Sequence, residues 1–181
     1  RERVRVEELP DDAADLFIGG KGLLYYYGFR LAPRAGDPLD PRFNVLVVAP
    51  GFLAGLAPSS SKVGFLARSP LTGILCDTYA GQVFAAKLRR AGYSALVIRG
   101  RARDPIYIYV EDDRIEFREA RHLWGSSTWD TWQAIRRETR LGASVAAIGP
   151  AGENLVRIAN IMVEGFLAAG RCGLGALMGS M

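Results

Sequence analysis

Short clusters of glycine constrain the fold of this chain more than any other feature of its sequence. Glycine accounts for 21 of the 181 residues, whereas its average usage in proteins is about 7%. The clusters lie between apolar runs, so we expect sharp turns or close backbone approaches there instead of a low-complexity tract. Four of them are candidate ligand-binding loops: residues 19–22, 51–61, 149–152 and 165–179.

Length and composition describe one ordinary globular unit. Hydrophobic residues make up 49% of the chain and charged residues 23%, which is a balance typical of folded proteins. A chain of 181 residues suits a single domain, 1–181. A domain of this size buries roughly 70% of its unfolded surface, so neither a metal nor a disulfide is needed for folding.

The net charge of +4 is a mild excess of 23 basic over 19 acidic residues. The basic residues are scattered, and the densest run, at Lys87, Arg89 and Arg90, is best interpreted as a solvated helix face. Nucleic-acid binding usually needs positive charge gathered on one face. The charge therefore fits an anionic small ligand or an acidic partner better than nucleic acid.

Cysteine and histidine are scarce, since the chain has only Cys76, Cys172 and His122. Without a C-x-x-C spacing, a thiolate or imidazole metal site cannot be assembled from this chain alone. The two thiols could pair only in an oxidising compartment, and nothing in the sequence indicates one. No signal peptide precedes the first residue and no apolar run reaches ~20 residues, so we expect a cytoplasmic protein without a membrane span.

Hydrophobic periodicity predicts more strands than helices. Strands are expected at residues 3–8, 44–49, 62–69, 73–79, 95–99, 106–111, 114–119, 144–148 and 157–163. Helices are expected from Asp11, from Leu23, over 82–91 and from Ser127. Because strands outnumber helices and do not alternate with them one for one, the pattern favours an α+β fold over a doubly wound parallel sheet.

Two local patterns mark expected helix ends. Gly92 follows the helix 82–91 at the place where a left-handed cap is needed. The run from Ser127 to Asp130 resembles a capping box with Asp at its third position. Three apolar residues of the helix that begins there are expected to share one face and to pack in the core: Trp129, Trp132 and Ile135.

Three of the glycine clusters carry or border a cation, namely Lys21, Lys62 or Arg171. Exposed backbone N–H groups beside a cation can cradle a phosphate. The spacing of the glycines fits such a cradle and an ordinary glycine-containing turn equally well. No P-loop sequence occurs, and the run from Gly170 to Gly175 matches a dinucleotide-binding fingerprint only in fragments.

Residues suited to catalysis are isolated from one another. His122 stands next to Leu123 and Trp124, and a structural role is a better interpretation than metal binding. Glu153 could act as a general base, yet the sequence places no partner residue beside it. We assign no catalytic residue, and the residues by themselves predict a module whose glycine loops hold an anionic ligand.

The loops, taken as whole strings, resemble the aldehyde ferredoxin oxidoreductase family. The matching strings are Arg68-Ser-Pro-Leu-Thr-Gly73, Leu88-x-x-Ala-Gly-Tyr93 continuing to Gly100, His122-Leu-Trp-Gly125, Ile148-Gly-Pro-Ala-Gly-Glu-Asn-Leu-Val156 and Ala168-Ala-Gly-Arg-x-Gly-Leu-Gly-Ala-Leu-Met-Gly-Ser180. They occur in the family's order and at its spacings over essentially the whole chain. The resemblance is therefore more specific than any single glycine motif.

The resemblance implies an N-terminal domain with an α+β fold, in which two β-sheets with a few flanking helices form a platform for two pterins. In that family the pterin dithiolene sulfurs hold tungsten or molybdenum without a direct protein ligand. Later helical domains, absent from residues 1–181, carry a [4Fe-4S] cluster. The enzyme oxidises an aldehyde with water to a carboxylic acid and passes two electrons through the cluster to ferredoxin. Since the cofactor carries the chemistry, this chain alone is expected to be inactive.

The same resemblance places pterin and phosphate contacts at seven positions: Lys62, Tyr79, Gly81, Leu167, Ala168, Gly170 and Arg171. Four keep the family's residue, whereas Lys62 replaces an Arg, Tyr79 an Asn and Leu167 an Arg. Lys62 keeps the charge but loses the planar fork of a guanidinium. Main-chain carbonyls of Tyr79 and Ala168 are implied to bind a Mg²⁺ that bridges the two pterin phosphates. At Leu167 a charge-assisted phosphate contact is lost, which is typically worth ~1.5–3 kcal/mol.

Two other interpretations remain beside the platform of an oxidoreductase. The replacements at Tyr79 and Leu167 are also consistent with a non-catalytic binding or interaction module that kept the fold and lost the cofactor. A nucleotide-binding domain is the third interpretation. We expect no nucleic-acid or membrane partner, ferredoxin enters only through a complete enzyme, and a homo-oligomer is left open.

Overall fold

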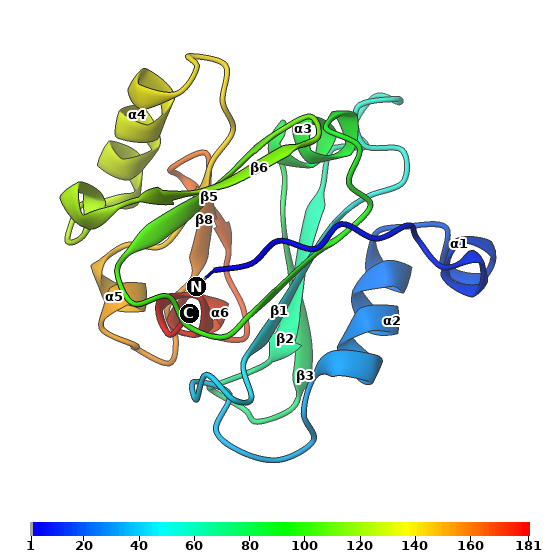
Figure 1. Cartoon of the computed structure of the whole chain (residues 1–181), viewed down its shortest axis with the longest axis horizontal. Coiled ribbons are helices and arrows are strands. Elements are labelled where there is room, and N and C mark those ends of the chain that lie inside the picture. The colour runs from blue at the N-terminus through cyan, green and yellow to red at the C-terminus, as the bar shows by residue number, and fades with distance from the viewer. Residues whose placement is uncertain (1) are drawn as a thin grey trace.

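The computed structural model describes residues 2–181 of the chain (Figure 1). Its elements are, in chain order, α1 (Asp11–Phe17), α2 (Lys21–Leu31), β1 (Val45–Pro50), β2 (Val63–Arg68), β3 (Leu75–Ala80), α3 (Phe84–Arg90), β4 (Leu96–Arg99), β5 (Ile106–Glu111), β6 (Arg114–Glu119), η1 (Arg121–Leu123), α4 (Thr128–Glu138), β7 (Ala146–Ala147), α5 (Pro150–Glu153), β8 (Ile161–Val163), β9 (Leu167–Ala169) and α6 (Leu174–Gly179). The α+β class predicted from the sequence is confirmed.

Every strand pairing among the described residues is antiparallel. The largest sheet has the order β3-β2-β1-β4, the β5-β6 hairpin stands as a second sheet, and β7-β8-β9 form a third. Where the family resemblance implied two sheets, the described strands thus fall into three hydrogen-bonded groups. The division arises because neither the hairpin nor the short C-terminal strands pair with the four-stranded sheet within residues 2–181.

The central strand β1 is buried on both faces, as its continuous apolar run predicts. Successive side chains of a strand point to opposite faces, and the core divides accordingly. On one face Val45 and Val47 pack with Leu23 and Leu24 of α2. Figure 1 shows α2 on one side of β1, β2 and β3, with α6 on the other.

The second face of the sheet supports the C-terminal part of the chain. Leu46 of β1 and Phe65 of β2 belong to the same buried cluster as Ile161 of β8 and Leu174 of α6. This packing brings β9 alongside β3, so segments almost a hundred residues apart in sequence become neighbours. The candidate site lies at that junction.

Several local predictions are confirmed. The hairpin pairs Ile106 with Glu119 and Glu111 with Arg114, as expected from its alternation. Gly92 adopts a left-handed φ of 91° after α3. The hydroxyl of Ser127 accepts a hydrogen bond from the backbone amide of Asp130 at 3.1 Å, which is the predicted cap of α4.

Other predictions are wrong. Residues 3–8 form no strand, because their alternating apolar side chains meet no strand beside them and stay exposed. Only the last part of the strand expected at 157–163 is present, as β8. Trp129 is 46% exposed instead of lying in the core, although its ring stacks 4.7 Å from that of Trp132.

None of the helices between residues 2 and 181 is both long enough and apolar enough to cross a membrane.

Candidate functional site

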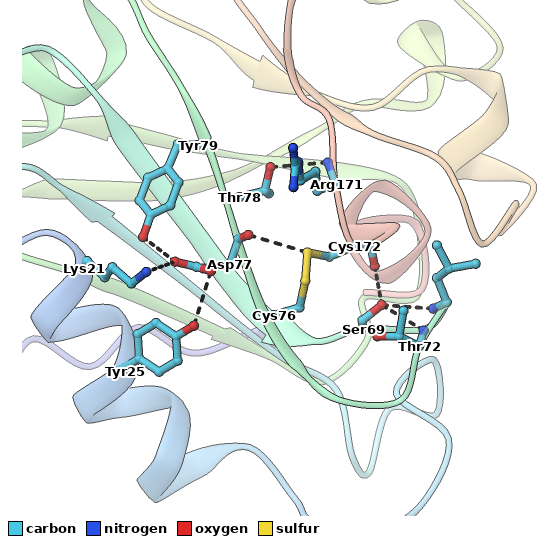
Figure 2. Close-up of a disulfide and its surroundings, with 11 residues drawn as sticks. Lys21, Tyr25, Ser69, Thr72, Cys76, Asp77, Thr78, Tyr79, Arg171 and Cys172 are labelled. Carbon is cyan, nitrogen blue, oxygen red and sulfur yellow. Dashed lines mark hydrogen bonds and ion pairs between the residues drawn. A yellow bond between two sulfur atoms is a disulfide. The ribbon is translucent and has the colours of Figure 1, made fainter.

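A polar pocket of about 480 Å³ lies where β3 approaches β9 and the start of α2. Figure 2 shows its surroundings, with side chains from α2 and β3 meeting the loop that follows β9. Seven residues line it: Lys21, Asp77, Thr78, Tyr79, Ala168, Gly170 and Arg171. Four of these are positions that the family resemblance marked in the sequence, and they come from two separate stretches of chain.

The loop after β9 is attached to β3 and to Ser69, the residue that follows β2. The backbone amide of Arg171 donates a hydrogen bond to Thr78 Oγ1 at 3.3 Å. One residue further along, the hydroxyl of Ser69 donates to the carbonyl of Cys172 at 2.6 Å. Cys172 is also disulfide-bonded to Cys76 of β3, across 96 positions of sequence. These attachments hold Arg171 at the mouth of the pocket.

The disulfide corrects the expectation of two separate thiols in a reducing compartment. The Cα atoms of Cys76 and Cys172 lie 6.0 Å apart, which is within the usual range for a disulfide. Sequence spacing could not show this proximity, because it arises only when β9 packs beside β3. Disulfides also persist in some intracellular proteins, so the bond by itself does not identify a compartment.

A tight turn follows Arg171. Cys172 and Gly173 both have a left-handed backbone, with φ of 71° and 67°. A Cβ atom on Gly173 would lie only 1.9 Å from the carbonyl oxygen of Arg157. Glycine is therefore required here by close backbone packing, and the turn leads directly into α6.

Asp77 is the centre of a hydrogen-bond network on the pocket wall. Its carboxylate accepts from the hydroxyl of Tyr25 at 3.2 Å and from the hydroxyl of Tyr79. The ammonium of Lys21 lies 3.3 Å from Asp77 Oδ2. With three donors around it, the carboxylate keeps its charge although its side chain is only 18% exposed.

The network changes the acidities of its members. Burial alone would raise the pKa of Asp77, but hydrogen bonds from Tyr79, Lys21 and Tyr25 outweigh burial, and the pKa is lowered from 3.8. The pKa of Tyr79 is raised well above 10.0, first by burial and then by its hydrogen bond to Asp77. Burial and Asp77 likewise raise the pKa of Tyr25. Both phenols consequently act as neutral donors at ordinary pH.

The pocket carries more positive than negative charge. Lys21 and Arg171 contribute cations, and Asp77 is the one carboxylate among the seven lining residues. Within residues 2–181 the guanidinium of Arg171 makes no hydrogen bond or ion pair to the protein, and the residue is exposed. Such a group is available to bind an anion.

Three of the seven positions predicted from the resemblance do not line the pocket. Lys62 immediately precedes β2 and Gly81 immediately follows β3, next to the paired residues Val63 and Ala80. Leu167 is half-buried at the start of β9 and packs against the apolar core. The structure thus brings four predicted residues together in the pocket, Tyr79, Ala168, Gly170 and Arg171, and places the other three outside its lining.

Sequence reasoning missed three residues of the pocket as site residues. Lys21 had been noted only as a cation inside a glycine cluster. Asp77 and Thr78 carry no sequence pattern beyond lying on a predicted strand, so only their tertiary neighbours reveal them. 

The isolated polar residues have structural partners elsewhere. Both carboxylate oxygens of Glu153 accept from the backbone amide of Gly125, at 2.9 and 3.1 Å. His122 Nε2 lies 2.7 Å from a carboxylate oxygen of Glu138. The described residues contain no group of three or more His, Cys, Asp or Glu side chains suited to hold a metal. A larger open groove of about 1690 Å³, beside β4 and β5, includes none of the seven predicted site residues.

Comparisons with known proteins identify the family to which the chain is similar. The family model of the aldehyde ferredoxin oxidoreductase N-terminal domain matches residues 1–181. Tungsten-containing aldehyde ferredoxin oxidoreductases of Pyrococcus furiosus and Thermococcus kodakarensis are both 42% identical to the chain, over 179 and 181 residues. Each alignment covers 98% of this chain and 29% of the relative. The chain thus spans less than a third of the length of these relatives.

Two further proteins show the range of similar chains. An aliphatic sulfonate oxidoreductase, WOR-like subunit, of Pyrococcus furiosus is 31% identical over 195 residues, covering 99% of this chain and 31% of that protein. The solved active site complex BamBC of benzoyl coenzyme A reductase, in complex with 1,5-dienoyl-CoA, superposes with a TM-score of 0.88. It is 33% identical, and the match covers 99% of this chain and 27% of the solved one.

Proposed function

This chain belongs to the aldehyde ferredoxin oxidoreductase family, and on that premise we propose that residues 1–181 form the pterin-binding platform of a cytoplasmic oxidoreductase. The observation that most supports this proposal is that one polar pocket is lined by four residues predicted from the sequence resemblance: Tyr79, Ala168, Gly170 and Arg171. Two separate segments supply these residues, so their convergence is not a consequence of sequence proximity.

The residues present suit the phosphate end of such a cofactor. Arg171 supplies an exposed cation with donors in a planar fork, which matches phosphate oxygens. Gly170 is exposed and has no side chain to block an approach to the backbone. Tyr79 and Ala168 offer main-chain carbonyls, which are hard oxygen donors of the kind that Mg²⁺ accepts. These two carbonyls would hold the Mg²⁺ that the resemblance implies.

Two of the predicted residues that do not line the pocket, Lys62 and Leu167, have other roles near it. Lys62 is exposed beside Gly81 at the end of the sheet, where it can contact a ligand that extends beyond the pocket. Leu167 supports β9 through its apolar packing instead of binding phosphate. Its side chain cannot replace the charge-assisted contact that an arginine would provide there.

Bound here, the bis-pterin metal group would supply the redox chemistry, oxidising an aldehyde with water to a carboxylic acid and passing two electrons through a [4Fe-4S] cluster to ferredoxin. The names of the relatives favour tungsten over molybdenum. The chain's own contribution is to bind and orient the phosphates. With no catalytic residue assigned, we expect the 181-residue chain alone to show no aldehyde oxidation with viologen dyes.

Metal and pterin analysis of the complete gene product tests the proposal. We expect stoichiometric tungsten and two pterin phosphates per polypeptide, measured by elemental analysis and by fluorescence of the oxidised pterin. A purified, folded product that contains neither would reject the platform function. It would support a non-catalytic module instead, which the apolar packing of Leu167 favours as the second candidate. Thermal stabilisation by a dinucleotide but not by pterin phosphates would support a nucleotide-binding domain.

A further inference from the structure

Lys21 contributes to the pocket from a part of the chain that the family positions do not include. It is the first residue of α2, and its ammonium lies at the pocket wall (Figure 2). Its side chain is 66% exposed, in contrast to that of its partner Asp77. The ammonium also lies 5.5 Å from the ring centroid of Tyr25. The side chain is therefore oriented by two neighbours and still open to solvent.

The glycine cluster 19–22 fixes the position of Lys21. A Cβ atom on Gly22 would lie 2.6 Å from the carbonyl oxygen of Phe17, so α1 and α2 meet too closely for a side chain there. Gly20 has a φ of 52°, and its amide donates to the carbonyl of Pro50 at 3.1 Å. For this cluster, close packing explains the glycines, and they hold Lys21 in place.

The ammonium has donors to spare. A lysine carries three N–H donors, and Asp77 is the one hydrogen-bonding partner that Lys21 has within residues 2–181. The carboxylate of Asp77 is meanwhile shared with the hydroxyls of Tyr25 and Tyr79. Lys21 can therefore bind a second acceptor in the pocket without leaving Asp77.

We propose that Lys21 is a phosphate-binding residue of this pocket and supplies, from α2, the positive charge that Leu167 does not. This role rests on the proposed function, because the phosphates are those of the pterin cofactor. Lys21 and Arg171 stand on different segments that line the same cavity, so together they contact the phosphate group from α2 and from the loop after β9. Asp77 is the positioning residue that orients the ammonium.

The test uses the complete gene product purified with its cofactor. The rate of pterin release is followed by fluorescence after dilution into buffer with inorganic pyrophosphate as competitor. We expect release from Lys21→Met to be roughly tenfold faster or more, since charge-assisted hydrogen bonds are being lost. Lys21→Arg should stay near the wild-type rate. Lys87→Met is the matched control, because Lys87 lies on α3 and does not line the pocket.

A second variant separates phosphate binding from a structural role of the Lys21–Asp77 pair. Asp77→Asn removes the ion pair and a negative charge beside the phosphates. The amide oxygen of the asparagine still accepts a hydrogen bond from the ammonium, so Lys21 stays oriented. Phosphate binding by Lys21 predicts that this variant releases pterin no faster than wild type. Acceleration by both variants, or an unchanged rate in Lys21→Met, overturns the proposal. If the wild-type protein contains no pterin, the proposed function itself fails and this inference fails with it.

Discussion

The backbone amide of Arg171 donates a hydrogen bond to the hydroxyl of Thr78, 3.3 Å away, and so joins the loop after β9 to the middle of β3. Two strands of different sheets thereby form one wall of the pocket. The bond uses the main chain of Arg171, which leaves its guanidinium free to face a ligand. The backbone of Arg171 thus anchors the loop while its side chain faces the ligand, and a mutation of the side chain removes only the second role.

Replacing Arg171 by alanine in the complete gene product should lower tungsten and pterin content while leaving the fold intact. The side chain is exposed, so its loss removes a phosphate contact typically worth ~1.5–3 kcal/mol without opening a cavity. Elemental analysis, pterin fluorescence and circular dichroism measure the two effects. Arg137→Ala is the control, because within residues 2–181 the exposed side chain of that arginine hydrogen-bonds only to Gln133 of α4. Unchanged metal and pterin content would remove Arg171 from the site.

The Cys76–Cys172 disulfide should stabilise the chain measurably. In the chain-entropy account, a cross-link that closes a long loop contributes about 2–4 kcal/mol, and this one spans 96 positions. The double variant Cys76→Ser, Cys172→Ser should therefore unfold at lower urea concentration than the oxidised protein. Adding dithiothreitol should reproduce the loss in wild type and have no effect on the double variant. Peptide mapping without reductant should recover the linked pair, and two alkylated thiols in the folded protein would contradict the bond.

Much of the framework around the site was predictable, because it depends on neighbours close in sequence. The β5–β6 hairpin follows from alternation around Asp112, and α4 begins at the cap that Ser127 provides. The run that forms β1 is apolar on both faces and is buried on both. The strand predicted at residues 3–8 is absent, because an alternating segment forms a strand only where another strand is present to pair with it.

The pocket was predictable only in part, for the opposite reason. Arg171 was predicted as a site residue through a string of residues that resembles a family, and it lines the pocket. Asp77 is an ordinary polar residue of a strand until Lys21 of α2 packs beside it. The pairing of Cys76 with Cys172 likewise exists only in three dimensions. Contacts over such separations leave no periodicity in the sequence.

Asp77 should make stability depend on pH in acid. Its pKa is lowered in the folded protein from 3.8, because hydrogen bonds from Tyr79, Lys21 and Tyr25 outweigh the burial that would raise it. A lowered carboxylate pKa stabilises the fold above 3.8, and this contribution is lost as the pH falls through the folded-state value. The difference in unfolding free energy between wild type and Asp77→Asn should be constant near neutrality and shrink below pH 3.8. A difference that does not change with pH would show that Asp77 is not stabilised as an anion.

Gly173→Ala tests whether the turn after Arg171 is set by backbone packing. The substitution places a Cβ 1.9 Å from the carbonyl oxygen of Arg157 and forces a left-handed φ of 67° on an alanine. The conformation alone costs about 1–2 kcal/mol, and the clash adds to it because its nearest atom is backbone, not a flexible side chain. Gly142→Ala is the matched control, since only the tip of Lys87 approaches its added Cβ, at 3.7 Å, and its φ is not left-handed. Urea unfolding should show a loss of stability in the first variant and little change in the second. Equal stability of the two variants would show that the loop can shift to make room. Because this turn also positions Arg171, Gly173→Ala should in addition lower pterin retention in the complete gene product.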